Sequence, residues 1–179
     1  RRGWVHRNQL PAAAGQPHWL TLPLAKGAPN LNIENLKFAT DAAGSMETRC
    51  RAFPVLRDVK HPLLDAMLAP SGNVVGYLGN LLSIACREMH LPFEVVRTST
   101  LQIPSAFSGQ DRVLEVCRKF GANRYVNLSG GRRLYDREQF ERQGVELQLF
   151  EPWTGSNWSI LYRLLTERPV DIANEIRGQ

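Results

Sequence analysis

Apolar residues recur at helical spacing over one long segment of the chain. They are Val74, Val75, Leu78, Leu81, Leu82, Ala85, Cys86 and Met89. Steps of three, four and seven residues place these side chains on one stripe of a helix, which faces the core in a globular protein. The pattern therefore predicts a helix over residues 74–89, with Cys86 as a buried core thiol.

A second helical pattern runs from about Gly109 to Phe120. Its apolar positions are Val113, Leu114, Cys117 and Phe120. The segment Ser108–Asp111 has capping-box spacing, and Gly121 suits the left-handed residue that ends many helices. Cys117 lies on the apolar stripe with no His near it in sequence to activate it. A core thiol is therefore preferred over a nucleophile.

Shorter patterns predict the other elements. Predicted strands are 19–24, 31–38, 93–98, 124–128 and 145–150, and predicted helices are 63–69, 136–143 and a tail over 158–176 with a break near Pro169. From residue 109 onward helix and strand alternate, an order typical of parallel crossovers. The chain is thus predicted to be one α/β domain over residues 1–179, with a mostly parallel sheet flanked by helices.

Composition agrees with an ordinary globular chain. Of 179 residues, 43% are apolar and 22% are charged, so folding needs no disulfide or metal. No apolar run is long enough to cross a membrane, and no secretory signal begins the chain, so membrane insertion is not expected. The three Cys are odd in number and far apart, so no disulfide framework is indicated, which predicts a reducing, cytoplasmic location. Neither the Cys nor the four His have the spacing of metal ligands.

The charge balance is basic but diffuse. There are 22 Lys and Arg against 17 Asp and Glu, a formal net charge of +5. A nucleic-acid surface normally clusters its basic residues among aromatic ones, whereas here they are scattered along the chain. Nucleic acid is therefore an unlikely partner.

One glycine-rich loop is a candidate anion site. Its residues are Ser129, Gly130 and Gly131 at the end of a predicted strand, followed by Arg132, Arg133 and Tyr135. Glycine lets backbone N–H groups approach a phosphate or carboxylate. The spacing is neither that of a Walker loop nor that of a GxGxxG fingerprint, so a plain tight turn beside solvated arginines is the favoured alternative.

The N-terminal segment from Arg2 to Asn8 is rich in side chains that stack and hydrogen-bond. The Arg7 guanidinium can hold a carboxylate or phosphate with two hydrogen bonds, and the Asn8 amide both donates and accepts. These residues are candidate substrate ligands. An exposed loop that packs Trp4 on the surface explains the segment equally well.

Ordered short blocks resemble the WbqC-like proteins. They are Arg2-Gly-Trp4-x-x-Arg7-Asn8, Trp19-Leu-Thr-x-Pro23, Gly121-Ala122-x-x-Tyr125, Leu128-Ser129-Gly130 with Tyr135, Phe140 and Gly144, and Ser159-Ile160-Leu161. Their order and approximate spacing agree over most of the chain. Residues 41–70 depart from the pattern, because the Trp and Lys-His expected before the first long helix are not evident.

The resemblance also implies a fold. The family usually begins with a block like His-Gln-Pro-x-Tyr-Leu-Pro-Trp, which is not present here and which looks like the first strand and loop of nucleotidyltransferase-like Rossmann folds. The expectation is an N-terminally incomplete WbqC-like domain, whose mostly parallel Rossmann-like sheet lacks its first strand-helix unit.

The function implied by the resemblance is an enzyme of bacterial surface-polysaccharide (O-antigen) or small-molecule biosynthesis, such as a transferase that moves an aminoacyl or acyl group to an amino sugar. An activated acyl donor or a nucleotide would be the cofactor, and a sugar or small-molecule substrate and an acyl carrier the partners. Substrate-binding residues would be Arg2, Arg7, Asn8, Ser129, Gly130, Gly131 and Tyr135. No catalytic residue is identified, so a non-catalytic nucleotide- or sugar-binding protein is the alternative, followed by a scaffold subunit.

Overall fold

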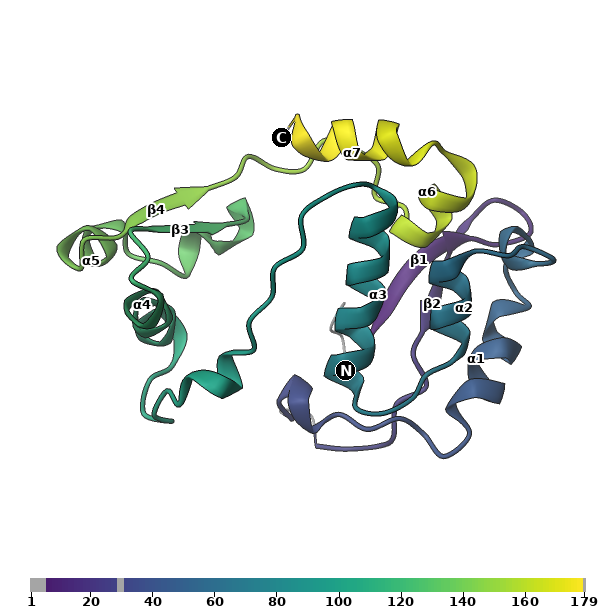
Figure 1. Ribbon diagram of the computed structural model, residues 1–179, viewed down its shortest axis with the longest axis horizontal. Helices are drawn as coiled ribbons and strands as arrows, with labels where there is room; N and C mark the ends of the chain where they lie inside the picture. Colours follow the sequence, from purple (N-terminus) through teal and green to yellow (C-terminus); the bar gives the residue numbers. More distant parts are fainter. Residues whose placement is uncertain (1–5, 29–30, 179) are drawn as a thin grey trace. The chain divides into compact units, whose positions relative to one another are not determined.

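The computed structural model describes residues 6–28 and 31–178, and its contacts divide the chain into two compact units (Figure 1). Unit 1 combines the chain up to Phe93 with Ser156–Gly178, and unit 2 is Glu94–Gly155. Each unit has its own apolar core.

A β-hairpin begins the described part of unit 1. Strands β1 (Arg7–Pro11) and β2 (Pro17–Thr21) pair antiparallel, with Gln9 opposite Trp19. The connection is only five residues long and contains Gly15 at φ 79°, so the chain reverses directly and a parallel crossover has no room. One face of the hairpin buries Leu10 and Leu20 in the core.

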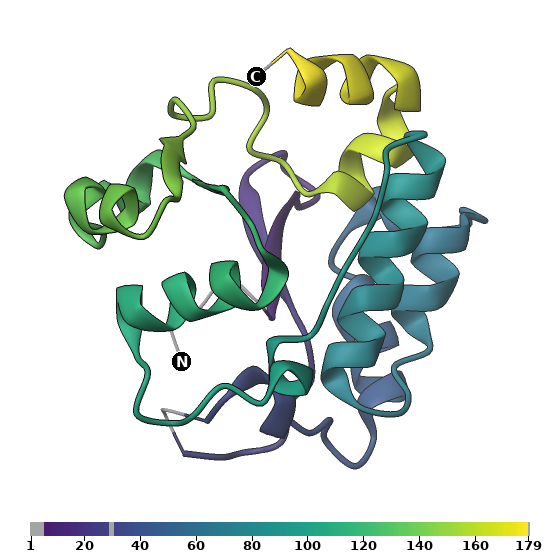
Figure 2. The ribbon, with the colours of Figure 1, turned by 60° about the vertical axis from the view of Figure 1, so that its left-hand side comes forward.

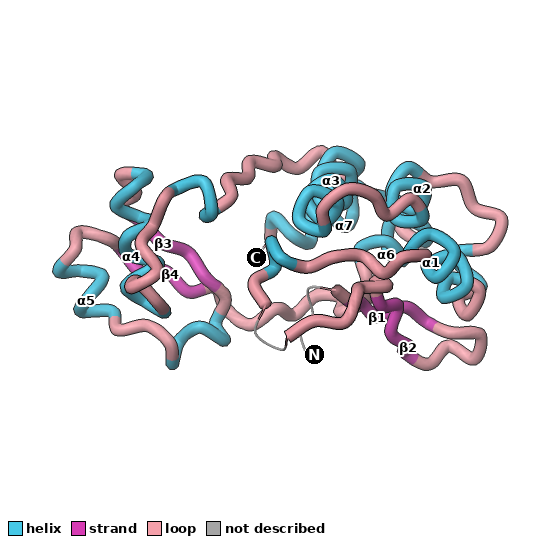
Figure 3. The backbone as a smooth tube through the Cα atoms, turned by 90° about the horizontal axis from the view of Figure 1, so that it is seen from below, coloured by secondary structure: helices cyan, strands magenta, loops and turns pink. Residues whose placement is uncertain are grey.

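Helices cover that face of the hairpin. They are α1 (Ala42–Cys50), α2 (Pro62–Leu68), α3 (Val74–Glu88), α6 (Ile160–Thr166) and α7 (Pro169–Arg177). Figure 3 shows them gathered on one side of β1 and β2. Side-chain caps begin four of the five, from Asp41, His61, Asn73 and Ser159.

Helix α3 confirms the longest predicted helix to within one residue. Its buried face is rotated from the predicted stripe, because Tyr77 and Ile84 are buried while Leu82 is 56% exposed. Cys86, predicted to lie in the core, is only half-buried. The Tyr77 hydroxyl donates a 2.7 Å hydrogen bond to the Met67 carbonyl, which joins α3 to the end of α2. The rotation thus lets a polar aromatic side chain enter the core with its hydrogen bond satisfied.

Unit 2 is built around a parallel strand pair. Helix α4 (Gly109–Phe120) precedes β3 (Arg124–Asn127), and α5 (Arg137–Arg142) connects β3 to β4 (Glu146–Leu149). The strands run parallel with Tyr125 opposite Leu147, as the helix-strand alternation predicts. Figure 2 shows the two helices beside the strands. The apolar core of unit 2 consists of the buried residues Cys117, Phe140, Val145 and Leu147.

The prediction of a mostly parallel, Rossmann-like sheet is wrong. The described residues contain one antiparallel and one parallel sheet of two strands each, and no extended parallel sheet. The predicted strand 31–38 contains a short 3-10 helix at Ile33–Asn35, and only Phe38 bridges to Leu24. Residues 93–98 form no strand, with Val95 and Val96 61% and 57% exposed. β-Branched composition alone does not make a strand, because a strand also needs a neighbour to pair with.

Among residues 6–28 and 31–178, no helix is both long and apolar enough to span a bilayer.

Candidate functional site

A polar cluster lies where β3 ends. The side-chain amide nitrogen of Asn127 donates to the Tyr135 hydroxyl at 3.2 Å, and the hydroxyls of Tyr135 and Tyr125 are also 3.2 Å apart. The other end of the amide is fixed as well, because Asn127 Oδ1 accepts a 2.8 Å hydrogen bond from the Leu128 backbone N–H. The orientation of Asn127 is therefore set by the backbone, and its N–H groups must face Tyr135.

Aromatic packing holds the two phenol rings. Tyr125 stacks on the buried Phe140, while the Tyr135 ring makes T-shaped contacts with both rings at centroid distances of 5.5 and 5.7 Å. Burial raises the pKa of Tyr125 first, and its hydrogen bond with Tyr135 raises it further. The Tyr125 hydroxyl is thus a neutral hydrogen-bonding group at physiological pH.

The two glycines of the adjoining loop differ. A Cβ on Gly131 would lie 2.9 Å from the Asn127 amide nitrogen and 3.0 Å from the Tyr135 ring, closer than side chains pack. A Cβ on Gly130 would meet nothing within 4 Å. Gly131 is needed so that the loop can approach the polar cluster, whereas Gly130 faces open space.

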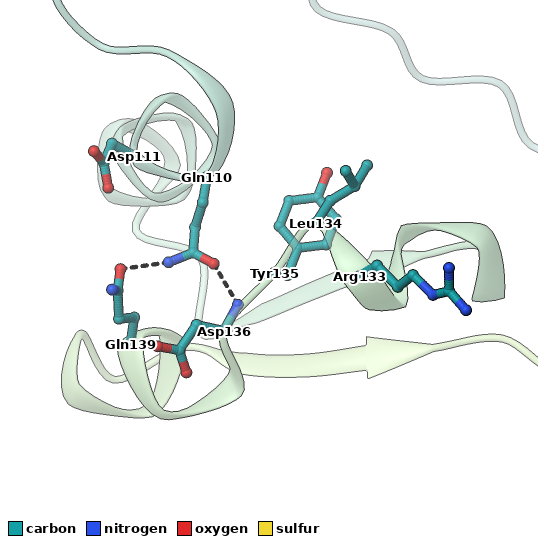
Figure 4. Close-up of a pocket in the computed structure, with 7 residues that line it drawn as sticks. All are labelled: Gln110, Asp111, Arg133, Leu134, Tyr135, Asp136 and Gln139. Carbon is teal, nitrogen blue, oxygen red and sulfur yellow. Dashed lines mark hydrogen bonds between the residues drawn. The ribbon is translucent and has the colours of Figure 1, made fainter.

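A hollow of about 430 Å³ adjoins the cluster. Its lining residues are Gln110, Asp111, Arg133, Leu134, Tyr135, Asp136 and Gln139, contributed by the start of α4, the loop after β3 and the start of α5. Figure 4 shows the amides of Gln110 and Gln139 and the Asp136 backbone linked in a chain of hydrogen bonds, with the Tyr135 hydroxyl at the far end of its ring from Asp136.

The chemistry of the hollow is mainly polar. Gln110 accepts a 2.5 Å hydrogen bond from the Asp136 N–H and donates to Gln139, so its amide orientation is also determined. Asp136 caps α5 by accepting from the Glu138 N–H at 3.0 Å. Carboxylates, amides and a guanidinium at one surface match a ligand with several hydroxyl or amino groups. Within the part of the chain that the structure describes, no group of three His, Cys, Asp or Glu side chains is arranged to hold a metal ion.

The structure brings some of the predicted site residues together. Ser129, Gly130, Gly131 and Tyr135 all lie in unit 2, on one short 3-10 turn and the loop that follows it. Leu134, also in that loop, is 69% exposed at the rim of the hollow.

The other predicted ligands belong to unit 1 or lie outside the described residues. Arg7 and Asn8 are in β1, where the Arg7 guanidinium lies 4.3 Å from the centroid of the Trp19 ring. Asn8 Oδ1 accepts a local hydrogen bond from the Gln9 N–H. Arg7 and Asn8 therefore lie in a strand, whereas Arg2 and Trp4, on which the surface-loop alternative depends, lie outside the described residues.

Sequence reasoning did not select Asn127, Gln110 or Gln139 as site residues. Asn127 directly precedes the Leu-Ser-Gly-Gly segment, and a polar residue at the end of a strand is a usable signal. Gln110 and Gln139 offer no such signal, because they lie on different helices and are 29 positions apart in the sequence.

The described cysteines have the properties of core residues. Burial, with a smaller contribution from Glu47, raises the pKa of the Cys50 thiol to about 11. Burial also raises the pKa of Cys117, which is packed in the core of unit 2 as predicted. A thiol with a raised pKa is a poor nucleophile at neutral pH, so these groups contribute packing rather than chemistry.

Comparisons with known proteins identify one relationship. No curated protein and no solved structure matches the chain significantly. The model of the WbqC-like protein family matches residues 1–161, which include the hairpin of unit 1 and the whole polar cluster and hollow of unit 2. Because this match extends over most of the 179 residues, the chain belongs to the WbqC-like protein family.

Proposed function

We propose that the protein is an enzyme that transfers an acyl or aminoacyl group to an amino sugar or a similar small molecule, in the biosynthesis of a surface polysaccharide. The observation that carries this proposal is the hollow of unit 2, where two carboxylates and two oriented amides lie beside the predicted substrate-binding residue Tyr135. Family membership supports it at a coarser level.

The hollow has the size and polarity for a sugar acceptor. Its volume of about 430 Å³ lies within the range of small-molecule sites, roughly 300 to 1,000 Å³. Gln110 and Gln139 offer amide donors and acceptors to hydroxyl groups, and Asp111 and Asp136 attract the ammonium form of an amino sugar. A neutral sugar would lose that last interaction.

In the proposed reaction the bound ammonium group first gives one proton to water, and the free amine that results attacks the carbonyl carbon of an activated donor, for example a thioester. A carbon–nitrogen bond forms, the carbon–sulfur bond breaks, and the sulfur leaves with the bonding electrons and receives the proton that the amine gives up. The protein's contribution is to position the two reactants and to stabilise the negative charge on the carbonyl oxygen.

The glycine-rich loop is the proposed source of donors to that oxygen. Gly131 is buried and its N–H donates to the Leu128 carbonyl at 2.9 Å, so the proposed donors are the N–H groups of Ser129 and Gly130, and Gly130 leaves the space beside it open. Arg7 and Asn8 remain proposed ligands of the substrate on the basis of their side-chain chemistry.

The test is a transfer assay with D-glucosamine as acceptor and acetyl or glycyl thioesters and adenylates as donors, with the product detected by mass spectrometry. We expect an amide of glucosamine. Gly130→Ala should abolish transfer without loss of the fold, because its Cβ meets no protein atom but obstructs a ligand. Gly79→Ala, another glycine whose Cβ would meet nothing, is the matched control and should retain full activity.

Two further variants test the other groups. Asp136→Asn keeps the cap of α5 but removes the negative charge, so KM for glucosamine should rise about tenfold. Glucose, which has no amino group, should inhibit the wild type and the variant equally well. Arg7→Ala should also abolish transfer. Full activity in both Arg7→Ala and Gly130→Ala would refute the assignment.

The second candidate is a sugar- or nucleotide-binding protein without catalysis. It is favoured by one observation: within the described chain, no Ser, Cys or Lys nucleophile is hydrogen-bonded to a general base at the hollow. Such a protein would be stabilised by glucosamine against thermal unfolding and would form no product with any donor.

A further inference from the structure

The polar cluster of Tyr125, Asn127 and Tyr135 leaves one hydroxyl hydrogen without an acceptor inside the cluster. Two tyrosine hydroxyls joined by one hydrogen bond use one of their two hydrogens. The third member does not take up the second hydrogen, because Asn127 presents its N–H side to Tyr135 and its oxygen to the Leu128 backbone. One hydroxyl hydrogen therefore has no acceptor among the described residues.

The Tyr125–Tyr135 hydrogen bond can run in either direction, and the unpaired hydrogen is that of Tyr135 when Tyr125 is the donor. The Tyr135 oxygen accepts from Asn127, and if Tyr125 also donates to it, both lone pairs are occupied and its own hydrogen must point outward. Donation by Tyr125 agrees with the raised pKa of Tyr125, since a phenol that donates a hydrogen bond holds its proton more strongly. Tyr135 is also the member of the cluster that lines the hollow.

We propose that Tyr135 donates a hydrogen bond to an acceptor-only oxygen of the substrate, a carboxylate, phosphate or carbonyl oxygen, and that Asn127 is the positioning residue that directs its hydroxyl hydrogen outward. This inference rests on the proposed function in so far as the hollow is the substrate site. It adds a specificity: the phenol end of the hollow selects the oxygen of an acid or acyl group, and the amide and carboxylate end selects hydroxyl and amino groups.

The geometry makes a matched pair of variants available. Tyr135→Phe and Tyr125→Phe each remove one oxygen and one hydrogen from the same cluster and keep the ring. Only Tyr135→Phe removes the outward hydrogen, so the two variants should differ in ligand binding although they change the same chemical group. Asn127→Asp provides a third comparison, because a carboxylate can still accept from Leu128 and also accepts the Tyr135 hydrogen.

The experiment is an NMR titration of the full chain with ¹³C-labelled tyrosine, whose four tyrosines are assigned by substitution. The probes are sodium acetate, inorganic phosphate and acetamide, with sodium chloride at constant ionic strength and glycerol as controls. We expect the Tyr125 and Tyr135 signals to move saturably with acetate, phosphate or acetamide and not with chloride or glycerol. The probe that binds most tightly identifies the oxygen as that of a carboxylate, a phosphate or a neutral carbonyl.

The variants give opposite expectations. Tyr125→Phe, followed through Tyr135, should keep the dissociation constant within about threefold, whereas Tyr135→Phe, followed through Tyr125, should raise it at least about tenfold. Asn127→Asp should also raise the dissociation constant for acetate at least about tenfold. Its circular dichroism spectrum should match that of the wild type, which shows that the fold is retained. A loss in Tyr125→Phe with full binding in Tyr135→Phe, or equal shifts with chloride, would overturn the proposal.

Failure of this inference is distinguishable from failure of the proposed function. If glucosamine is acylated at the same rate by wild type and Tyr135→Phe, the transferase assignment holds and the role of Tyr135 is refuted. If acetate or phosphate binds at Tyr135 with the expected variant pattern and no donor yields product, the donor role holds and the transferase is refuted.

Discussion

Arg163 and Glu175 form a two-point ion pair between helices α6 and α7. The two terminal nitrogens of Arg163 donate to the two carboxylate oxygens of Glu175 at 3.0 and 2.6 Å, and Arg163 also donates to Glu167. Arg163 is 3% exposed, whereas the side chains of Glu167 and Glu175 are about a third exposed. A buried cation is thus compensated by two carboxylates at the surface, one on each side of the break before Pro169.

The first prediction concerns this pair. Glu175→Gln should lower the midpoint of thermal unfolding by several degrees, because a buried guanidinium then loses one of its two charged partners. Asp171→Asn, which removes the partner of the exposed Arg168, is the matched control and should leave the midpoint nearly unchanged. Equal effects of the two substitutions would show that burial of Arg163 has no energetic consequence.

The second prediction is the pH dependence of the same pair. The hydrogen bonds from Arg163 and then from the Ser156 N–H lower the pKa of Glu175 below its ordinary value. The unfolded chain therefore binds this proton at a higher pH than the folded chain, so the contribution is complete well above about pH 4.3 and is lost as the pH falls. Unfolding midpoints of wild type and Glu175→Gln should differ at pH 7 and converge as the pH is lowered toward 3.

The third prediction compares the two glycines of the loop. Gly131→Ala should lower the free energy of unfolding by about 1 to 3 kcal/mol, because the new methyl group must displace Asn127 or Tyr135. Gly130→Ala should leave it unchanged within about 0.5 kcal/mol, since its Cβ meets nothing. Urea denaturation of both variants measures the difference, and equal stability would argue against the close approach at Gly131.

The fourth prediction concerns the hydrogen bond between α3 and α2. Tyr77→Phe should cost about 1 to 3 kcal/mol of unfolding free energy, because the buried carbonyl of Met67 loses its donor. Tyr162→Phe is the control: in the described part of the chain no hydrogen bond involves the Tyr162 hydroxyl, so its removal should have little effect. Comparable losses in the two variants would contradict the assigned role of the Tyr77 hydroxyl.

Local signals predicted the ends of several elements. The apolar stripe located α3 to within a residue, and Gly121 ends α4 in the left-handed conformation with φ 59°, as expected for its type. Asp136 caps α5 as predicted, whereas Ser108 precedes α4 without a side-chain cap hydrogen bond. These features depend on residues within a few positions of one another, which is why sequence spacing is enough to find them.

Pairing between distant segments was predicted less well. The hairpin partner of β2 was not predicted to be a strand, and residues 31–38 and 93–98 were predicted to be strands of a larger sheet that the described residues do not form. Helix α1 was not predicted. The single domain predicted over residues 1–179 and the roles of Arg7 and Asn8 stay predictions.

The sequence by itself determined the family, the helical periodicity and the parallel strand pair around the Ser-Gly-Gly loop, because each is encoded in neighbouring residues or in the order of short blocks. Only the tertiary structure decided that there are two small sheets, that Asn127 is oriented toward Tyr135, and that Gln110 and Gln139 meet at the hollow. The physical reason is that a hydrogen bond between side chains depends on how separate elements pack, and no spacing within a single element specifies that packing.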